Sequence, residues 1–243
     1  MTITLTSPEV AGRAGLADFG AIAHDMFSEA MLGDTLDRVL AIGEQSFGGD
    51  AAGFLLVTGD QHVQALAASH RDAAIADQLQ VETRQGPGQQ AIARQQPVIA
   101  TDLRSDSRWR FWAPLAADLG FRSVLSLSLQ DGDTSGALTL YSRRTSNFTS
   151  ADLPVAQVFA QHAAIAVAIA TEREQLMRAV RTRGVVAQAQ GILMERHHIP
   201  ADHALTVLRR YATHLGQELF VFAQRFIEDR TLPPLDPTTA LSS

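Results

Sequence analysis

The sequence predicts an α+β domain, in which helices flank a central antiparallel sheet, followed by a long connecting helix and a three-helix all-α unit. Two pairs of short apolar runs, each pair separated by a turn-like segment, alternate with amphipathic stretches. An alanine-rich stretch then runs to about His198 and precedes two more amphipathic stretches. We therefore expect one domain over residues 16–170, a helical extension and domain over residues 171–229, and disordered tails at residues 1–15 and 230–243.

The elements of the first domain follow from hydrophobic periodicity. Apolar residues at three- and four-residue spacing predict helices, and short apolar runs beside turn residues predict strands. The two turns are Thr58-Gly59-Asp60-Gln61 and Asp131-Gly132-Asp133. The predicted helices are residues 16–31, 35–47, 72–79, 89–95 and 111–119, and the predicted strands are residues 52–57, 63–68, 98–100, 123–129 and 137–141.

The long helix has a recognisable start. Thr149 and Asp152 have the spacing of a capping box, and Phe148 and Leu153 have the spacing of a hydrophobic staple around it. Unbroken to about His198, the helix would be roughly 70 Å long, which is too long for one small domain to bury. The long helix is therefore predicted to connect two domains.

A seam of mostly apolar residues along this helix predicts association with a second copy. The spacing is 4-3-4-3, the pattern of a parallel coiled coil, and the seam includes one charged residue. We expect a homodimer. The seam residues are Ile165, Ile169, Glu172, Leu176 and Ala179.

The second unit is completed by two short helices at residues 201–212 and 216–227. Their apolar residues are expected to pack against the end of the long helix. The prolines after Thr231 favour a disordered tail.

Composition excludes several classes of site and indicates a compartment. The chain has no cysteine, which excludes disulfides, thiolate metal centres and thiol nucleophiles. Residues 1–15 lack the features of a signal peptide, and no stretch approaches 18 uninterrupted apolar residues. We expect a cytoplasmic protein without a membrane segment.

The charges are unevenly distributed along the chain. Residues 1–172 carry a net charge of −8, whereas residues 173–243 carry +2, and every basic residue is arginine. The C-terminal part is therefore the region expected to face a polyanion, although a solvated helical face would have a similar composition.

No catalytic residue, metal site or cofactor is predicted. The segment Gly86–Ala91 matches a dinucleotide fingerprint with Asp102 downstream, but the residues before it are polar, and Pro87 lacks an amide donor. A turn that begins a helix is the favoured interpretation, and an enzyme that uses this loop is the rival one. The histidines at 197, 198, 203 and 214 do not have metal-site spacing.

The first domain resembles GAF domains of actinobacterial regulators. Short motifs occur in the order found in that family, and the order is more specific than any single motif. A GAF domain implies sensing of a signal, but without cysteine, and with Gly88 where relatives often have cysteine, it cannot attach a bilin or perform thiol chemistry. The motifs are Gln85–Ala91, Thr101-Asp102-Leu103, Ser107-Arg108-Trp109 and Gly120–Leu125.

The second unit resembles ANTAR, the RNA-binding domain of transcription antitermination regulators. The resemblance rests on Arg183, on the segment Gln188–Met194 with its A-x-G-x-L-M core, on Ala204 and on Leu208-Arg209-Arg210. It implies a homodimer that binds tandem RNA hairpins in nascent transcripts under control of the GAF domain.

By this resemblance, the candidate RNA-binding residues are Arg183, Gln190, Arg209, Arg210 and Tyr211. Arginine forks can hold phosphates, and a tyrosine ring can stack on an unpaired base. For Arg209 and Arg210 the alternative is a solvated helix face, and for Tyr211 it is a core aromatic.

The sequence departs from the family at positions expected to contact RNA. Gln190 and Glu218 stand where the family usually has lysine, and Ala212 and Gly216 replace the usual serine and asparagine. Fewer cations weaken phosphate attraction. The rival function is therefore a dimeric ligand sensor whose C-terminal helices bind a protein.

A small-molecule ligand of the GAF-like domain is the remaining expected partner. Its alternative is a filled core, and the ligand itself is unknown. The core would be closed by Phe54, Leu56, Leu66, Val124, Leu138 and Leu140.

Overall fold

The computed structural model describes residues 31–59, 62–132 and 134–232. It divides into two compact units, Met1–Arg173 and Glu174–Ser243, and each is described by itself. We call them the sensor unit and the helical unit.

The sensor unit is built on a five-stranded sheet in the order β2-β1-β5-β4-β3, and all neighbouring strands are antiparallel. The sequence predicted both hairpins, β1–β2 and β4–β5, from their turn residues. The strands are β1 (Ala51–Thr58), β2 (His62–Ala68), β3 (Val98–Ala100), β4 (Ser123–Asp131) and β5 (Thr134–Ser142).

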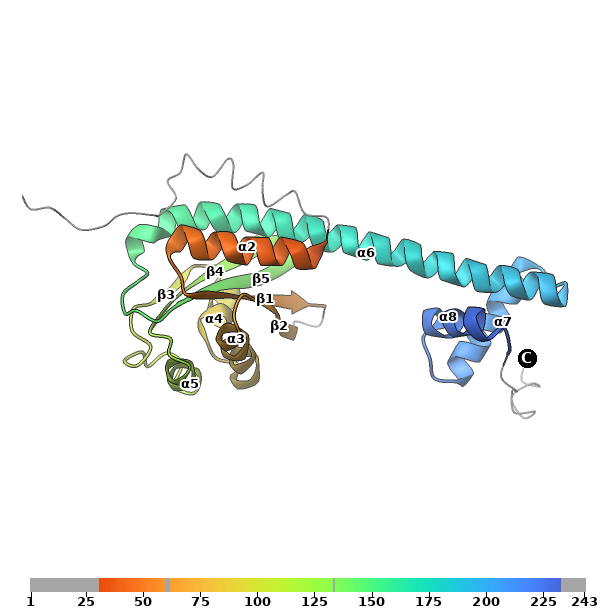
Figure 1. Ribbon diagram of the computed structural model, residues 1–243, viewed down its shortest axis with the longest axis horizontal. Helices are drawn as coiled ribbons and strands as arrows, with labels where there is room; N and C mark the ends of the chain where they lie inside the picture. The colour runs from red at the N-terminus through yellow and green to blue at the C-terminus, as the bar shows by residue number, and fades with distance from the viewer. Residues whose placement is uncertain (1–30, 60–61, 133, 233–243) are drawn as a thin grey trace, which may run out of the picture. The chain divides into compact units, whose positions relative to one another are not determined.

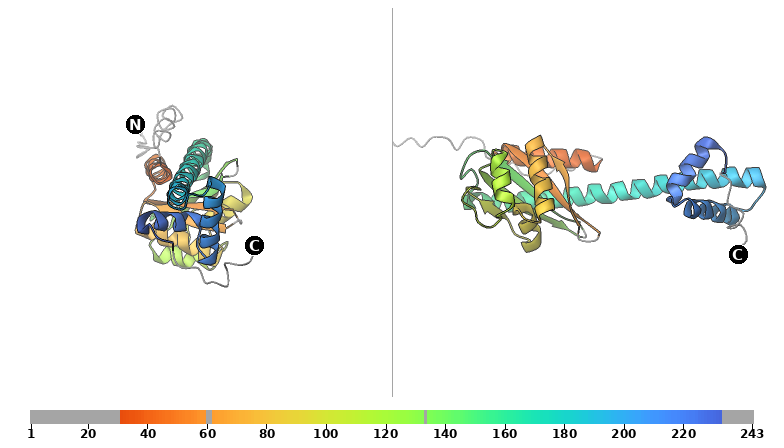
Figure 2. Two further views of the ribbon diagram at one scale, coloured as in Figure 1. Left: turned by 90° about the vertical axis from the view of Figure 1, so that its right-hand side faces the viewer. Right: turned by 90° about the horizontal axis from the view of Figure 1, so that it is seen from below.

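Helices cover both faces of the sheet (Figures 1 and 2). On one face, α2 (Leu32–Phe47) and the first part of α6 (Leu153–His197) bury the apolar side chains of Leu125, Leu138 and Leu140. On the other face lie α3 (Arg71–Thr83), α4 (Pro87–Arg94) and α5 (Trp112–Asp118). Because side chains alternate along a strand, β4 and β5 contribute to both cores.

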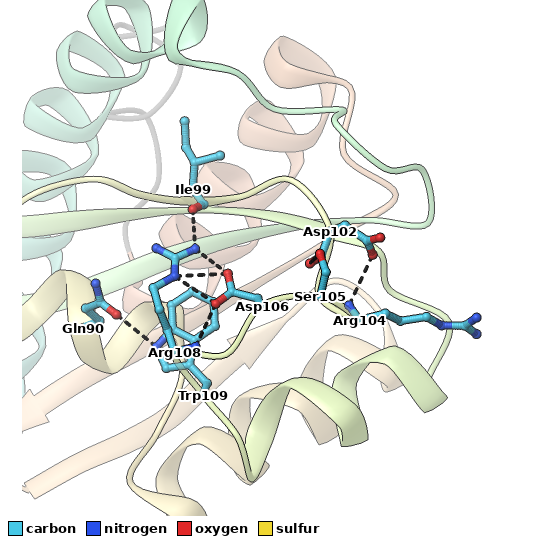
Figure 3. A network of polar contacts seen from close by, with 8 residues as sticks. All are labelled: Gln90, Ile99, Asp102, Arg104, Ser105, Asp106, Arg108 and Trp109. Carbon is cyan, nitrogen blue, oxygen red and sulfur yellow. Dashed lines mark hydrogen bonds and ion pairs between the residues drawn. The ribbon is translucent and has the colours of Figure 1, made fainter.

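The loop between β3 and α5 is held by its own side chains (Figure 3). The Arg108 guanidinium binds the Asp106 carboxylate and donates to the Ile99 carbonyl at 2.6 Å. The Trp109 indole donates to Gln90 Oε1 at 3.0 Å. Asp102 accepts from the Arg104 amide and from the Arg122 side chain. The family-like motifs of this loop therefore have a structural explanation.

Helix α6 begins as the sequence predicted. The Thr149 amide donates to Asp152 Oδ2 at 2.7 Å, and both halves of the capping box are formed around the 3₁₀ turn Ser150–Asp152 that precedes α6.

Ser150–His197 contains an 18-residue stretch that is apolar enough to cross a membrane, and 44% of that stretch is buried. A core helix of a soluble protein passes the same test, and the buried side chains Phe159, Ala163 and Val167 pack in the sheet core.

The helical unit contains the C-terminal part of α6 with α7 (Ala201–His214) and α8 (Leu219–Asp229). Its core is formed by one apolar face of each of the three helices, with buried residues three or four positions apart, as expected for amphipathic helices. The Tyr211 ring stacks on Phe222 with centroids 5.7 Å apart. The buried core residues are Ala189, Leu193, Ala204, Leu208, Ala212, Phe222, Ala223 and Phe226.

Several sequence predictions differ from the structure or lie outside the described residues. The helix over 16–31 falls almost entirely outside the described residues, as do both predicted tails apart from residues 230–232. Helix α3 extends to Thr83, beyond the predicted end at residue 79. Helix α8 begins at Leu219, because Gly216 adopts a left-handed φ of 63° and its amide bonds to the Thr213 carbonyl.

Candidate functional site

A fully buried polar cluster lies between the sheet and α3 in the sensor unit. Asp77 and Gln80 are one helical turn apart on α3, and Tyr141 projects from β5. The Tyr141 hydroxyl donates to Asp77 Oδ1 at 2.5 Å, and Gln80 Nε2 donates to the same oxygen at 2.9 Å. Gln80 Oε1 accepts from the Gly88 amide at 2.7 Å. Three separate elements are therefore joined inside the core.

Glycines make the space for these side chains. A Cβ on Gly53 would lie 1.9 Å from Asp77 Oδ2, and one on Gly86 would lie 2.3 Å from Gln80 Oε1. A Cβ on Gly88 would lie 2.7 Å from a methyl group of Leu55. Gly86 also has a φ of 143°, a conformation that L-residues rarely adopt. A larger residue at any of these three positions would therefore clash with the cluster or with Leu55.

Burial changes the acidity of both ionisable groups. Burial raises the pKa of Asp77 from 3.8 to about 7, against the opposing hydrogen bonds from Tyr141 and Gln80. Burial and the nearby Asp77 carboxyl raise the pKa of Tyr141 well above its usual value. Asp77 Oδ2 has no hydrogen-bond partner among the described residues. A neutral Asp77 is the form that this site favours.

Large aromatic side chains fill the rest of this face. Trp109 and Trp112 meet edge to face at 5.6 Å, and Phe121 stacks on Tyr141 at 4.7 Å. The Trp112 indole donates to the Ala76 carbonyl at 2.9 Å. This face is a packed interior with its polar atoms largely paired.

Most of the residues expected to close a filled core are buried. Four of them are completely buried, whereas Leu56 is half-buried and Leu66 on β2 is 41% exposed. The buried four are Phe54, Val124, Leu138 and Leu140.

The glycine-containing loop before α4 does not have the context of a dinucleotide fingerprint. Helix α3 precedes it in place of a strand, and the Gly88 amide is already bound by Gln80. Pro87 occupies the first turn of α4, as expected for a segment that begins a helix. The loop contributes to the buried cluster, because its Gly88 amide bonds to Gln80 and its glycines leave room for that side chain.

In the helical unit, Arg183 and Gln190 lie on α6 at i and i+7, so they share a face two turns apart. Arg183 is exposed, whereas Gln190 is half-buried and donates through Nε2 to the Ala201 carbonyl at 2.7 Å. The Gln190 amide is therefore engaged with the start of α7.

Arg209, Arg210 and Tyr211 follow one another on α7 and point in different directions. Both arginines are exposed, and the half-buried Tyr211 stacks on Phe222. The side of the Tyr211 ring that faces Phe222 belongs to the core.

Helical spacing places two histidines on the same face of α7 as Arg210. His203 and His214 precede and follow Arg210 by seven and four residues, and both are exposed. The sequence did not predict this alignment, because the predicted helix ended at residue 212 and so left out His214. Asp202 falls instead on the face of Arg209.

Two glycines on α6 have no structural reason to be glycine within the described residues. A Cβ on Gly184 or Gly191 would meet nothing within 4 Å. With the exposed Ala187, they form a smooth stripe beside Arg183. Glycine costs a helix interior about 1 kcal/mol relative to alanine.

Comparison with protein families identifies both units. The family model of the GAF domain matches residues 29–168, and the model of the ANTAR domain matches residues 174–227. No protein with a curated description is similar enough to count as a match.

Two solved GAF domains share the fold of the sensor unit. The GAF domain of a phosphoenolpyruvate-protein phosphotransferase from Coxiella burnetii is 16% identical, with a TM-score of 0.52, over 66% of this chain and 96% of that one. Its counterpart from Acinetobacter is 14% identical, with a TM-score of 0.51, over 65% and 94%. The free methionine-R-sulfoxide reductase of Neisseria meningitidis is 18% identical over 63% and 87%, with a TM-score of 0.47.

Proposed function

The chain belongs to the GAF domain family and carries an ANTAR domain after it, and we propose from this order that it binds hairpin RNA in nascent transcripts as an antitermination regulator. The GAF domain supplies signal control, with a small molecule as its signal, and the protein acts in the cytoplasm. The observation that carries the proposal is the ANTAR match over residues 174–227, a region with a net positive balance of charge.

The proposed RNA-binding face uses arginines that the structure leaves exposed. Arg183 on α6 and Arg209 and Arg210 on α7 are all exposed at the surface of the helical unit. Their guanidinium groups suit phosphate oxygens, because each can donate two parallel hydrogen bonds. The exposed face of Tyr211 is available for stacking on an unpaired base.

The smooth stripe on α6 lies beside Arg183 and is part of the proposed RNA-binding face. Gly184, Ala187 and Gly191 present almost no side chain beside Arg183, so a nucleic-acid backbone can come close to the helix. Gln190 replaces the cation usual for the family, and its amide already bonds to Ala201. In this chain the arginines therefore carry the phosphate contacts.

The proposed homodimer uses the exposed seam of α6. Ile165, Ile169 and Leu176 are 40%, 52% and 61% exposed, although they are large and apolar. Val180 lies next to the seam residue Ala179 and is also exposed. Pairing with the same seam of a second copy would bury these side chains. A homodimer also has two copies of the helical unit, one for each of two tandem hairpins.

The test is a titration of full-length protein into labelled RNA that carries two short tandem hairpins, with a scrambled RNA as control and at several salt concentrations. Preferential binding to the hairpins is expected. The logarithm of the binding constant should fall linearly with the logarithm of the salt concentration, with a slope of roughly 0.7 to 0.9 for each phosphate that the protein neutralises. Equal binding to both RNAs would contradict the proposal.

Matched arginine variants locate the face. Arg209→Ala with Arg210→Ala is expected to weaken hairpin binding and to flatten its salt dependence. Arg225→Ala removes one positive charge from α8, where Arg225 pairs with Asp229, and is expected to change binding far less than Arg209→Ala alone or Arg210→Ala alone. Equal effects at the two places would mean that only net charge matters.

One observation favours a second function, the binding of a protein through the helical unit. Glu218 is exposed, and Gln190 is engaged with Ala201, so neither residue offers a cation to a phosphate. Exposed Val221 on α8 adds apolar surface near Glu218. Crosslinking in cells discriminates between the two functions, since this alternative predicts crosslinks to protein and no enriched RNA.

A further inference from the structure

A pocket of about 400 Å³ lies at the edge of the sensor sheet, between the outer side of β4 and helix α6. It is on the α6 side of the sheet, away from the buried Asp77 cluster. Its volume lies within the range of ordinary ligand sites. The pocket plays no part in the proposed RNA binding.

The outer edge of β4 is only partly covered. Strand β3 pairs with Val124, Leu125 and Ser126, and the nine-residue β4 continues to Asp131. No strand among the described residues pairs with the outer edge beyond Ser126. Ser128 and Gln130, which both line the pocket, belong to this uncovered part.

The hydrogen-bonding direction of the edge follows from β3. The Ile99 carbonyl accepts from Arg108, so the backbone groups of Ile99 face away from β4. Those of Val98 therefore face β4, where Ser126 is the partner of Val98. Because backbone groups alternate along a strand, the N–H and C=O groups of Ser128 and Gln130 point to the same outer side as those of Ser126.

The chain itself prevents β3 from covering this edge. Pro97 directly precedes β3, and its backbone faces away from β4 as that of Ile99 does, so the next ladder position, opposite Ser128, would belong to Gln96. Gln95 caps α4 with a left-handed φ of 54°, which turns the chain out of an extended path. Among the described residues, the ladder position opposite Ser128 is therefore open.

The side chains around the edge are polar and uncharged. The floor is formed by Leu127, Ala160 and Ala164, and none of the lining residues that the structure describes is charged. The glutamine amides can each donate and accept. They are Gln95, Gln130, Gln157 and Gln161.

We propose that this pocket binds an extended, uncharged peptide segment, which adds to β4 as a sixth strand beside the start of β3. The backbone groups of Ser128 and Gln130 supply the ladder hydrogen bonds, as in other cases of strand addition. The glutamine amides and the small apolar floor accept neutral side chains and disfavour charged ones, since a charge there would be desolvated without a partner. The peptide touches α6 directly through Gln157 and Gln161.

The test is a titration of full-length protein with a blocked tetrapeptide of alternating alanine and glutamine, followed by NMR of the backbone amides. Binding is expected to shift the Ser128 and Gln130 amides. The control is the same peptide with N-methyl groups on the amides that would pair with β4, for which binding is expected to weaken on the order of tenfold. Equal binding of the two peptides, shifts only elsewhere, or no binding would overturn the proposal.

A variant tests the edge from the protein side. Ser128→Pro removes the outward N–H while leaving the bonds to β5 intact, because proline is tolerated at an edge whose N–H faces outward. Weaker peptide binding with an unchanged melting temperature is expected. If the variant does not fold, the N-methyl comparison still decides. If Ser128→Pro instead converts a dimer into a monomer, the edge pairs with a second copy and the peptide proposal is wrong.

The peptide titration contains no RNA. Failure of the peptide to bind leaves the RNA-binding proposal untouched, and failure of RNA binding leaves the pocket assignment untouched. The two results are therefore separable.

Discussion

The Tyr141 hydroxyl on β5 donates a 2.5 Å hydrogen bond to Asp77 on α3, and both residues are completely inaccessible to solvent. The partners are 64 positions apart in the sequence. This bond joins the sheet to the helix layer that covers it. It also places a titratable group where its charged form is costly, so the stability of the sensor unit should depend on pH.

The first prediction concerns Asp77→Asn. Burial raises the pKa of Asp77 from its ordinary value of 3.8 to about 7 in the folded state, so between these values the folded state holds a proton that the unfolded state has lost. The free energy of unfolding therefore falls as pH rises through this window, by at most about 1.4 kcal/mol per unit. Its contribution is full below about pH 4 and is lost by about pH 7. The asparagine variant lacks this dependence.

Urea unfolding followed by tryptophan fluorescence measures this effect, since both tryptophans, Trp109 and Trp112, pack on this face. Between about pH 5.5 and pH 7, the wild type should lose roughly 2 kcal/mol more than Asp77→Asn. Parallel pH profiles of the two proteins would contradict the assignment.

The second prediction concerns the space beside Asp77. Gly53→Ala places a methyl group 1.9 Å from Asp77 Oδ2, so we expect a loss of about 1–3 kcal/mol from overpacking. Adding Asp77→Ala removes the clash, so the double variant should be more stable than the sum of the single effects implies. Gly59→Ala is the control, because nothing lies within 4 Å of its Cβ. Additive effects would show that the two sites are not coupled.

The sequence predicted the sheet well and the buried cluster poorly, for a physical reason. The pairing of β4 with β5 and the Thr149–Asp152 capping box were predicted from local signals, and the structure contains both. The polar end of α3 shows no such signal. Gln80 can be buried there because Gly86 and Gly88, six and eight residues later in the chain, leave room for its side chain.

In the candidate RNA site, too, the exposure of side chains was predictable from the sequence, whereas a contact between two helices was not. Helical periodicity was enough to suggest that Arg209 and Arg210 are exposed, and they are. The bond from Gln190 to Ala201 depends on how α7 turns back after Pro200, which periodicity does not encode.

The third prediction concerns the smooth stripe on α6. Gly184→Ala with Gly191→Ala should raise the thermal midpoint, because each alanine favours the helix by up to about 1 kcal/mol. It should also weaken hairpin RNA binding on the order of tenfold, since the added methyl groups hold the nucleic acid away from Arg183. Gly33→Ala on α2 is matched, because its Cβ also meets nothing within 4 Å. It should leave RNA binding unchanged, and an unchanged affinity in the α6 variant would remove the stripe from the RNA face.

The fourth prediction concerns the dimer seam, where Glu172 interrupts a row of apolar residues. Leu176→Glu adds a second charge to the seam, and the two copies would then bring like charges together, so sedimentation equilibrium should show weaker association. Glu172→Leu removes the interruption and should tighten association. Gln175→Glu is the control, because it adds the same charge to an exposed position off the seam. If all three variants associate equally, α6 does not hold the dimer together through this seam, and two hairpins would have to be bound by a different arrangement of subunits.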